Sequence, residues 1–203
     1  MPYGITTDGT NLYVSDSANN KIRKIVISSG AVTTFAGPPA GTTTSGDTDN
    51  ATSSEARFSL PIGSSSDGTS FYIAEYGNHK IRKINISSGA VTTLAGPPAG
   101  TKSSGDTDNA TSSNARFNGP VGMTTDGTNL YVTEAGNDKI RKIVISSGEV
   151  TTLAGPPAGT TTSGDTDNDT ASNARFNTPY GISSDGTYIY VGDFGNNKVR
   201  RIE

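Results

Sequence analysis

The sequence predicts an all-β protein made of repeated four-stranded antiparallel sheets. Three observations support this prediction: the chain of 203 residues repeats itself every 59 residues, an Asp-Gly pair recurs inside each repeat, and short β-branched segments alternate with polar turns. No stretch combines helical periodicity with helix caps. A repeat of this length is typical of an architecture in which each unit is one supersecondary element that stacks on its neighbours.

The repeats divide the whole chain, residues 1–203, without a remainder between them. The boundaries fall at Pro2, Pro61, Pro120 and Pro179. The units occupy residues 2–60, 61–119, 120–178 and 179–203. The first and third units differ at 14 of 59 positions, and the fourth stops after 25 residues. Such close identity is typical of recent amplification or of engineering, so recurrence of a residue is not by itself a sign of function.

Each unit reads as a four-stranded meander. In the first unit the expected strands are residues 3–7, 11–15, 21–27 and 31–36. Asp8-Gly9 separates the first two strands, and Asp-Gly favours a tight hairpin because both residues accept a positive φ at low cost. The last strand, Val-Thr-Thr-Phe-Ala, is rich in β-branched residues. A polar loop over residues 40–56 then leads to the next unit.

Radial packing of these sheets is the expected architecture. A single four-stranded meander is marginal alone, and packing around an axis buries both of its faces, which predicts a β-propeller. Glycine at the third position of each unit, as at Gly4 and Gly63, suits the crowded innermost strand. The alternative is a β-solenoid, whose repeats are usually shorter and contain no meander.

Several stretches resemble a known signature. The segments Pro2-Tyr3-Gly4-Ile5 and Asn20-Lys21-Ile22-Arg23, and above all Tyr76-Gly77-Asn78-His79-Lys80-Ile81-Arg82, are similar to the NHL repeat, as is the linker that ends Ala56-Arg57-Phe58. The resemblance covers all four units and implies a β-propeller whose innermost strand is the Pro-x-Gly segment. It does not determine function, because one fold hosts many activities.

The number of blades leaves the ring open. The fourth unit ends after its third strand, so the chain carries about 3.75 blades, whereas propellers usually have about 4–8. Three interpretations remain: a four-bladed ring with one short blade, part of a longer array, or half of a ring that two copies complete. Uncovered blade faces and strand edges favour association. We expect a homodimer that forms one ring of about eight blades.

The long polar loop of each unit holds the candidate binding site. The candidate residues are Asp47, Asp49, Asn50, Asp106, Asp108, Asn109, Asp165, Asp167 and Asn168. Alternating oxygen side chains begin a calcium loop, but Ca²⁺ needs about 6–8 oxygens and the bidentate glutamate is missing. Asx turns explain the same residues. We therefore expect no cofactor, with Ca²⁺ on these acids as the alternative.

Two further acidic sets have a structural interpretation. One lies in the Asp-Gly turns, where Asp serves backbone geometry. The other closes the second strand, and an arginine follows seven residues later in every unit. These acids are Asp16, Glu75, Glu134 and Asp193, and the arginines are Arg23, Arg82, Arg141 and Arg200. We prefer a repeated structural ion pair to a ring of charged ligands.

Composition argues against nucleic acid binding and against catalysis. Twelve of the 16 Lys and Arg lie in the four Lys-Ile-Arg-Lys-type strands, yet each strand has a matching acidic set and the net charge is −3. RNA-binding relatives need a continuous positive face with aromatic platforms. The chain has no Cys, no Trp and one histidine, His79, whose place is taken by Asn or Asp in the other units. No ligand set for a channel metal is visible.

We therefore expect a non-catalytic scaffold or binding module that self-associates and presents its loops to a protein or glycan. Two alternatives remain: a propeller hydrolase or lyase with a channel metal, and an engineered or excised repeat with no selected function. No apolar run approaches the length of about 18 residues that spans a membrane, and no leader is visible. We expect neither a membrane nor a nucleic acid partner, and an extracellular setting within a longer, bacterial-type protein.

Overall fold

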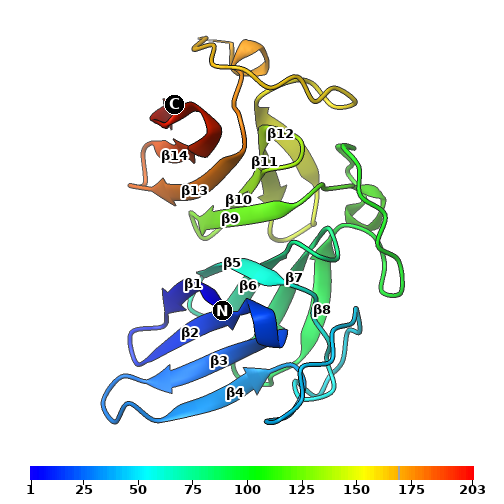
Figure 1. Cartoon of the computed structure of the whole chain (residues 1–203), viewed down its shortest axis with the longest axis vertical. Helices are drawn as coiled ribbons and strands as arrows, with labels where there is room; N and C mark the ends of the chain where they lie inside the picture. The colour runs from blue at the N-terminus through cyan, green and yellow to red at the C-terminus, as the bar shows by residue number, and fades with distance from the viewer. Residues whose placement is uncertain (169) are drawn as a thin grey trace.

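The computed structural model describes residues 1–168 and 170–203 and confirms the all-β propeller architecture (Figure 1). Four antiparallel sheets follow one another in chain order, and within each sheet the strands pair in sequence order. In the described residues, three sheets have four strands and the last has three. Each sheet is one blade of the propeller, as the repeat predicts.

The strand bounds repeat from blade to blade. Blade 1 contains β1 (Pro2–Thr7), β2 (Asn11–Asp16), β3 (Lys21–Val26) and β4 (Val32–Ala36). Blade 2 contains β5 (Pro61–Ser66), β6 (Ser70–Glu75), β7 (Lys80–Asn85) and β8 (Val91–Ala95). Blade 3 contains β9 (Pro120–Thr125), β10 (Asn129–Glu134), β11 (Lys139–Val144) and β12 (Val150–Ala154). Blade 4 contains β13 (Pro179–Ser184), β14 (Ile189–Asp193) and β15 (Lys198–Ile202). Short 3-10 turns are η1 (Ser17–Asn19), η2 (Ser112–Asn114), η3 (Ala171–Asn173) and η4 (Phe194–Asn196).

The Asp-Gly hairpin turns form as the sequence predicts. Asp8 Oδ1 accepts hydrogen bonds from the backbone N–H groups of Thr10 and Asn11 at 2.8 and 2.6 Å. Gly9 takes the positive φ of the turn, +87°. The hydroxyl of Tyr13 donates to Asp8 Oδ2 at 2.9 Å and ties the second strand to the turn. Burial and this hydrogen bond raise the pKa of Tyr13 to about 12.

The first strand of each blade is the innermost, and its glycine permits close packing. A Cβ atom on Gly63 would lie 1.9 Å from the carbonyl oxygen of Val121 in the next blade. The inner strands β1, β5, β9 and β13 contact one another in this order. The register of each inner strand is interrupted around its glycine, between Pro61 and Ser64 in blade 2. Glycine is therefore a packing requirement here.

Three separate cores hold the blades together. Each lies between two successive blades, so both faces of blades 2 and 3 are covered, whereas blades 1 and 4 are each covered on one face. Phe58, Phe117 and Phe176, which end the linkers between blades, are buried in these cores. Stability therefore depends on neighbour-to-neighbour interfaces, as in other repeat proteins. No helix in the described part of the chain is long and apolar enough to cross a membrane.

Candidate functional site

The candidate residues lie in three segments that we call the acidic linkers. The acidic linkers are residues 46–58, 105–117 and 164–176. Each folds back on itself: in the first linker the N–H of Gly46 donates to the carbonyl of Phe58 at 2.9 Å. Asn50 Oδ1 accepts from the N–H of Thr52 at 2.8 Å, which confirms the Asx turn. Local hydrogen bonds therefore give each linker a defined shape.

Both aspartates of the first linker bind the third strand of the next blade. Lys80 Nζ lies 2.5 Å from Asp47 Oδ1, and an Arg82 guanidinium nitrogen lies 2.6 Å from Asp49 Oδ1. The other oxygen of Asp49 accepts the backbone N–H of Thr93 in β8 at 2.9 Å. The linker of one blade therefore clamps two strands of the following blade.

Arg82 is the centre of this clamp. Its guanidinium also donates to Glu75 at 2.8 Å, and the side chains of both residues are fully buried. It lies 5.1 Å above the ring of Phe58, a cation–π contact with the end of the linker. Burial acts to lower the pKa of Arg82, but the carboxylates of Glu75 and Asp49 outweigh it and raise that pKa, so the cation is retained.

Blade 3 repeats the arrangement almost atom for atom. Lys139 pairs with Asp106 at 2.6 Å, and Arg141 pairs with Asp108 at 2.5 Å and with Glu134 at 2.7 Å. The predicted pairing of the second-strand acid with the arginine seven residues later is confirmed in blades 2, 3 and 4. In blade 1 the same two side chains are 3.8 Å apart.

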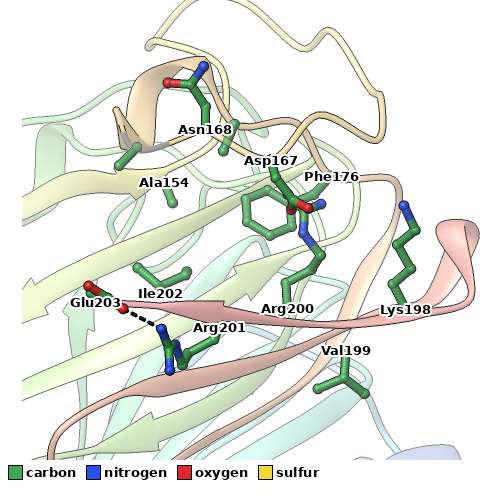
Figure 2. A pocket seen from close by; sticks show the side chains of 12 residues that line it. Ala154, Asp167, Asn168, Phe176, Lys198, Val199, Arg200, Arg201, Ile202 and Glu203 are labelled. Atoms are coloured by element: carbon green, nitrogen blue, oxygen red, sulfur yellow. Dashed lines mark hydrogen bonds and ion pairs between the residues drawn. The ribbon is translucent and has the colours of Figure 1, made fainter.

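Blade 4 has the same pairs in a more open setting. Lys198 pairs with Asp165 and Arg200 with Asp167, both at 2.5 Å. The Asp167 side chain is 83% exposed, against 33% for its counterpart Asp49. Figure 2 shows Asp167 and Arg200 turned toward each other above the β15 ribbon. They border a cleft of 710 Å³ that Phe176 and residues of β15 also line. Blade 4 has no fourth strand in the described residues to cover it.

The structure thus brings the predicted residues to the seams between blades. The six linker aspartates each contact a lysine or arginine of the next blade. Asn50 and Asn109 form backbone bridges with Val91 and Val150, and Asn168 borders the cleft. In the described part of the chain, no group of three or more His, Asp or Glu side chains is placed to hold a metal ion. Ligand binding by these residues stays a prediction.

Sequence reasoning did not anticipate which groups the linkers would contact. Each aspartate and its cation are 33 residues apart, from Asp47 to Lys80 and from Asp49 to Arg82, and the spacing recurs in the next two units. This constant spacing of 33 residues was the signal in the sequence from which the contact could have been found. A single repeat unit does not reveal the contact, because its two residues belong to different blades.

A second seam contact involves His79. This residue has a positive φ of +54°, and its Nδ1 accepts the N–H of Gly119 at 3.2 Å. In the other units Asn20 and Asp138 accept the equivalent N–H groups, at 3.0 and 2.7 Å. Burial lowers the pKa of His79. The position therefore joins successive blades through any side chain that can accept a hydrogen bond.

Radially packed four-stranded meanders joined by linkers of this kind define a β-propeller. The chain is 30% identical to NHL repeat-containing protein 2 of Bos taurus over 165 residues, which is 76% of this chain and 22% of that protein. The human protein of the same name is 31% identical over 152 residues. The repeats, the blades and these relatives together place the chain in the NHL-repeat β-propeller family. It spans about a fifth of the length of the curated relatives that it matches.

Solved structures show the same fold. An auxiliary nutrient binding protein from Bacteroides thetaiotaomicron matches with a TM-score of 0.69 at 20% identity, over 95% of this chain and 45% of that chain. A virginiamycin B lyase from Staphylococcus aureus matches with a TM-score of 0.59 at 21% identity, over 100% of this chain and 52% of that chain. No family model matches the sequence. At these identities the likeness concerns the fold alone.

Proposed function

We propose that this chain is a non-catalytic binding scaffold whose open ends associate with a second copy to complete one propeller ring. The observation that carries the proposal is a contrast among the inner-strand glycines. A Cβ on Gly4, Gly63 or Gly122 would lie 2.3, 1.9 or 2.1 Å from a backbone carbonyl oxygen of the next blade. At Gly181 in blade 4 no such neighbour lies within 4 Å. The inner strand of blade 4 therefore has room beside Gly181 for a further inner strand.

The two end blades also expose apolar side chains that inner blades cover. On blade 4 the side chain of Val199 is exposed, and on blade 1 those of Tyr3, Ile5 and Val32 are exposed. Exposed apolar groups that gather on a sheet face favour association.

The rim of the ring would carry repeated hydroxyl-rich segments. Residues 42–45, 101–104 and 160–163 are exposed and contain Thr and Ser in every unit. The clamps fix the acidic linkers next to them, so the segments stand at regular intervals on rigid supports. Such an array gives multivalent contact to a protein or glycan without a strong single site. A printed glycan array tests this role, with binding that a variant carrying alanine in all three segments loses; no binding by the native chain to any printed glycan would count against it.

Light scattering on a sizing column tests the self-association. The native chain should have twice the mass of 20.8 kDa. Gly181→Ala should fold normally and elute as a monomer, because its Cβ would meet the backbone of the joining blade. Ser183→Ala, an exposed change in the same strand, is the control and should stay dimeric. A monomeric native chain, or a dimeric Gly181→Ala, would contradict the proposal.

A further inference from the structure

The seam between blades 2 and 3 contains residues that the other seams lack. The chain enters blade 3 through Asn118-Gly119, and Asn118 is the only asparagine in the sequence that glycine follows. The only histidine, His79, lies at the same seam. The equivalent pairs at the other two seams are Ser59-Leu60 and Asn177-Thr178. Two departures from an otherwise close repeat therefore meet at one place in the interior of the arc.

An Asn-Gly pair favours cyclisation of the asparagine side chain onto the backbone. The backbone nitrogen of the following residue attacks the amide carbon of the side chain, and glycine has no side chain to crowd this nitrogen. The nitrogen must lose its proton as it attacks, so a base within hydrogen-bond reach of that proton assists the reaction. Asn118 and Gly119 supply the electrophile and the nucleophile on adjacent residues.

His79 places a base on the proton that has to leave. Its Nδ1 accepts the N–H of Gly119 at 3.2 Å, a distance at which proton transfer is possible. Because Nδ1 is the acceptor, the imidazole is neutral, and burial favours this form by lowering the pKa of His79. A Cβ on Gly119 would lie 2.9 Å from the ring of Tyr76, so this contact requires glycine.

Hydrogen bonds to blade 3 fix the position of Asn118. Its backbone N–H donates to Glu134 Oε1 at 2.7 Å, and its carbonyl accepts the N–H of Gly136 at 3.1 Å. Its side-chain Nδ2 donates to the carbonyl of Gly136 at 3.1 Å, and this is the bond that cyclisation breaks. The residue is half-buried, so water reaches the amide group.

We propose that Asn118-Gly119 is a self-modification site at which His79 acts as the base. The nitrogen of Gly119 passes its proton to His79 Nδ1 and forms a bond with Asn118 Cγ. The bond between Cγ and Nδ2 then breaks, and Nδ2 takes the proton back from the imidazolium and leaves as ammonia. Water opens the resulting cyclic imide at either carbonyl and gives aspartate or isoaspartate. Water is the only reactant from outside the chain.

The modification would weaken the seam between blades 2 and 3 with time. Both products place a carboxylate beside Glu134, whose side chain is fully buried. Isoaspartate also adds one carbon to the main chain, which displaces the backbone groups that Asn118 pairs with Gly136. The site lies between two interior blades, so the proposal does not depend on whether the ends of the arc associate.

Mass spectrometry of tryptic peptides measures the modification. The native chain is kept at neutral pH and physiological temperature, and the peptide of residues 117–139 is followed with time. Exchange of the amide for a carboxyl group changes its mass, and fragmentation assigns the change to Asn118. The matched variant His79→Asn removes the base and keeps an acceptor, because Asn20 accepts the equivalent N–H at 3.0 Å. Asn177, which precedes Thr178, is the internal control, and circular dichroism verifies that the variant is folded.

In the folded native chain, Asn118 should convert at least about tenfold faster than in His79→Asn, and faster than Asn177. In guanidinium chloride the native chain and the variant should convert at the same rate, because unfolding separates His79 from Gly119. Equal rates in the folded proteins would overturn the proposal, as would a difference that persists in guanidinium chloride. Asn118 that stays intact in the folded native chain while the unfolded chain converts completely would overturn it too.

Discussion

Replacing Arg82 by methionine should destabilise the chain far more than the same change at Arg23, although the two arginines occupy the same place in the repeat. The Arg82 side chain is fully buried and binds Glu75 at 2.8 Å and Asp49 at 2.6 Å. The Glu75 side chain is fully buried as well. Methionine at this position would therefore leave a buried carboxylate without its cation.

The magnitude follows from the burial of each pair. Removing one partner of a buried ion pair costs about 3–5 kcal/mol. The Arg23 side chain is 33% exposed and lies 3.8 Å from Asp16, so this pair contributes about 0–1 kcal/mol. For a domain of this size each kcal/mol shifts Tm by roughly 2–4 °C. We expect Tm to fall by roughly 6–20 °C for Arg82→Met and by at most about 4 °C for Arg23→Met.

Thermal unfolding at pH 7, followed by circular dichroism at low protein concentration, measures both shifts. The double variant Arg82→Met with Glu75→Leu provides a further check, because an apolar pair removes the uncompensated charge and should recover part of the lost stability. Equal Tm losses for Arg82→Met and Arg23→Met would refute the reasoning. A double variant less stable than Arg82→Met alone would also refute it.

Three further predictions follow from the same geometry. Gly63→Ala should lower Tm by roughly 2–12 °C, because its Cβ would overlap a backbone carbonyl, whereas Gly181→Ala should leave the Tm of the monomer unchanged. Thermal unfolding of both variants measures the two shifts, and equal shifts would contradict the close packing of the inner strands. Stability should fall as the pH drops from about 4 to 2. Burial acts to raise the pKa of Asp67, but hydrogen bonds outweigh it and lower this pKa to about 2, below the unfolded value of about 3.9. The ionised Asp67 therefore stabilises the fold above about pH 3.9, and this stabilisation is lost on acidification. Asp67→Asn should show a smaller acid loss in the same titration, and parallel curves would exclude this origin. Asp108→Asn should lower Tm more than Asp167→Asn, because the first side chain is 32% and the second 83% exposed, and the reverse order in calorimetry would contradict the clamp.

The blades could be predicted because their signals are local and repeated. The side chain of Asp8 binds backbone groups two and three residues ahead, so an Asp-Gly pair specifies its turn without help from distant residues. The Pro-x-Gly segment indicates the crowded inner strand for the same reason, since only a missing side chain permits the contact of Gly63 with the next blade. The 59-residue period then extends one blade to the whole chain.

The seams could not be predicted in the same way. The sequence predicts that Asp47 lies in a polar loop at the rim, whereas its partner Lys80 lies 33 residues away in another blade. Burial of that pair depends on how two sheets pack, which no single unit encodes. The open ends are equally hard to predict, because Gly181 and Gly63 occupy the same place in the repeat. The two positions differ in whether another blade packs against the glycine.

Hydrogen exchange measured across a series of protein concentrations tests the central claim that the two ends of the arc associate. At low concentration, β7 and β11, whose lysine and arginine side chains are bound by the linkers, should exchange slowly, and β1 and β15 should exchange fast. Raising the concentration should slow exchange in β1 and in the inner strand of blade 4, β13, with little change in β7. Exchange that does not depend on concentration at either end, or slows equally in every blade, would contradict the account.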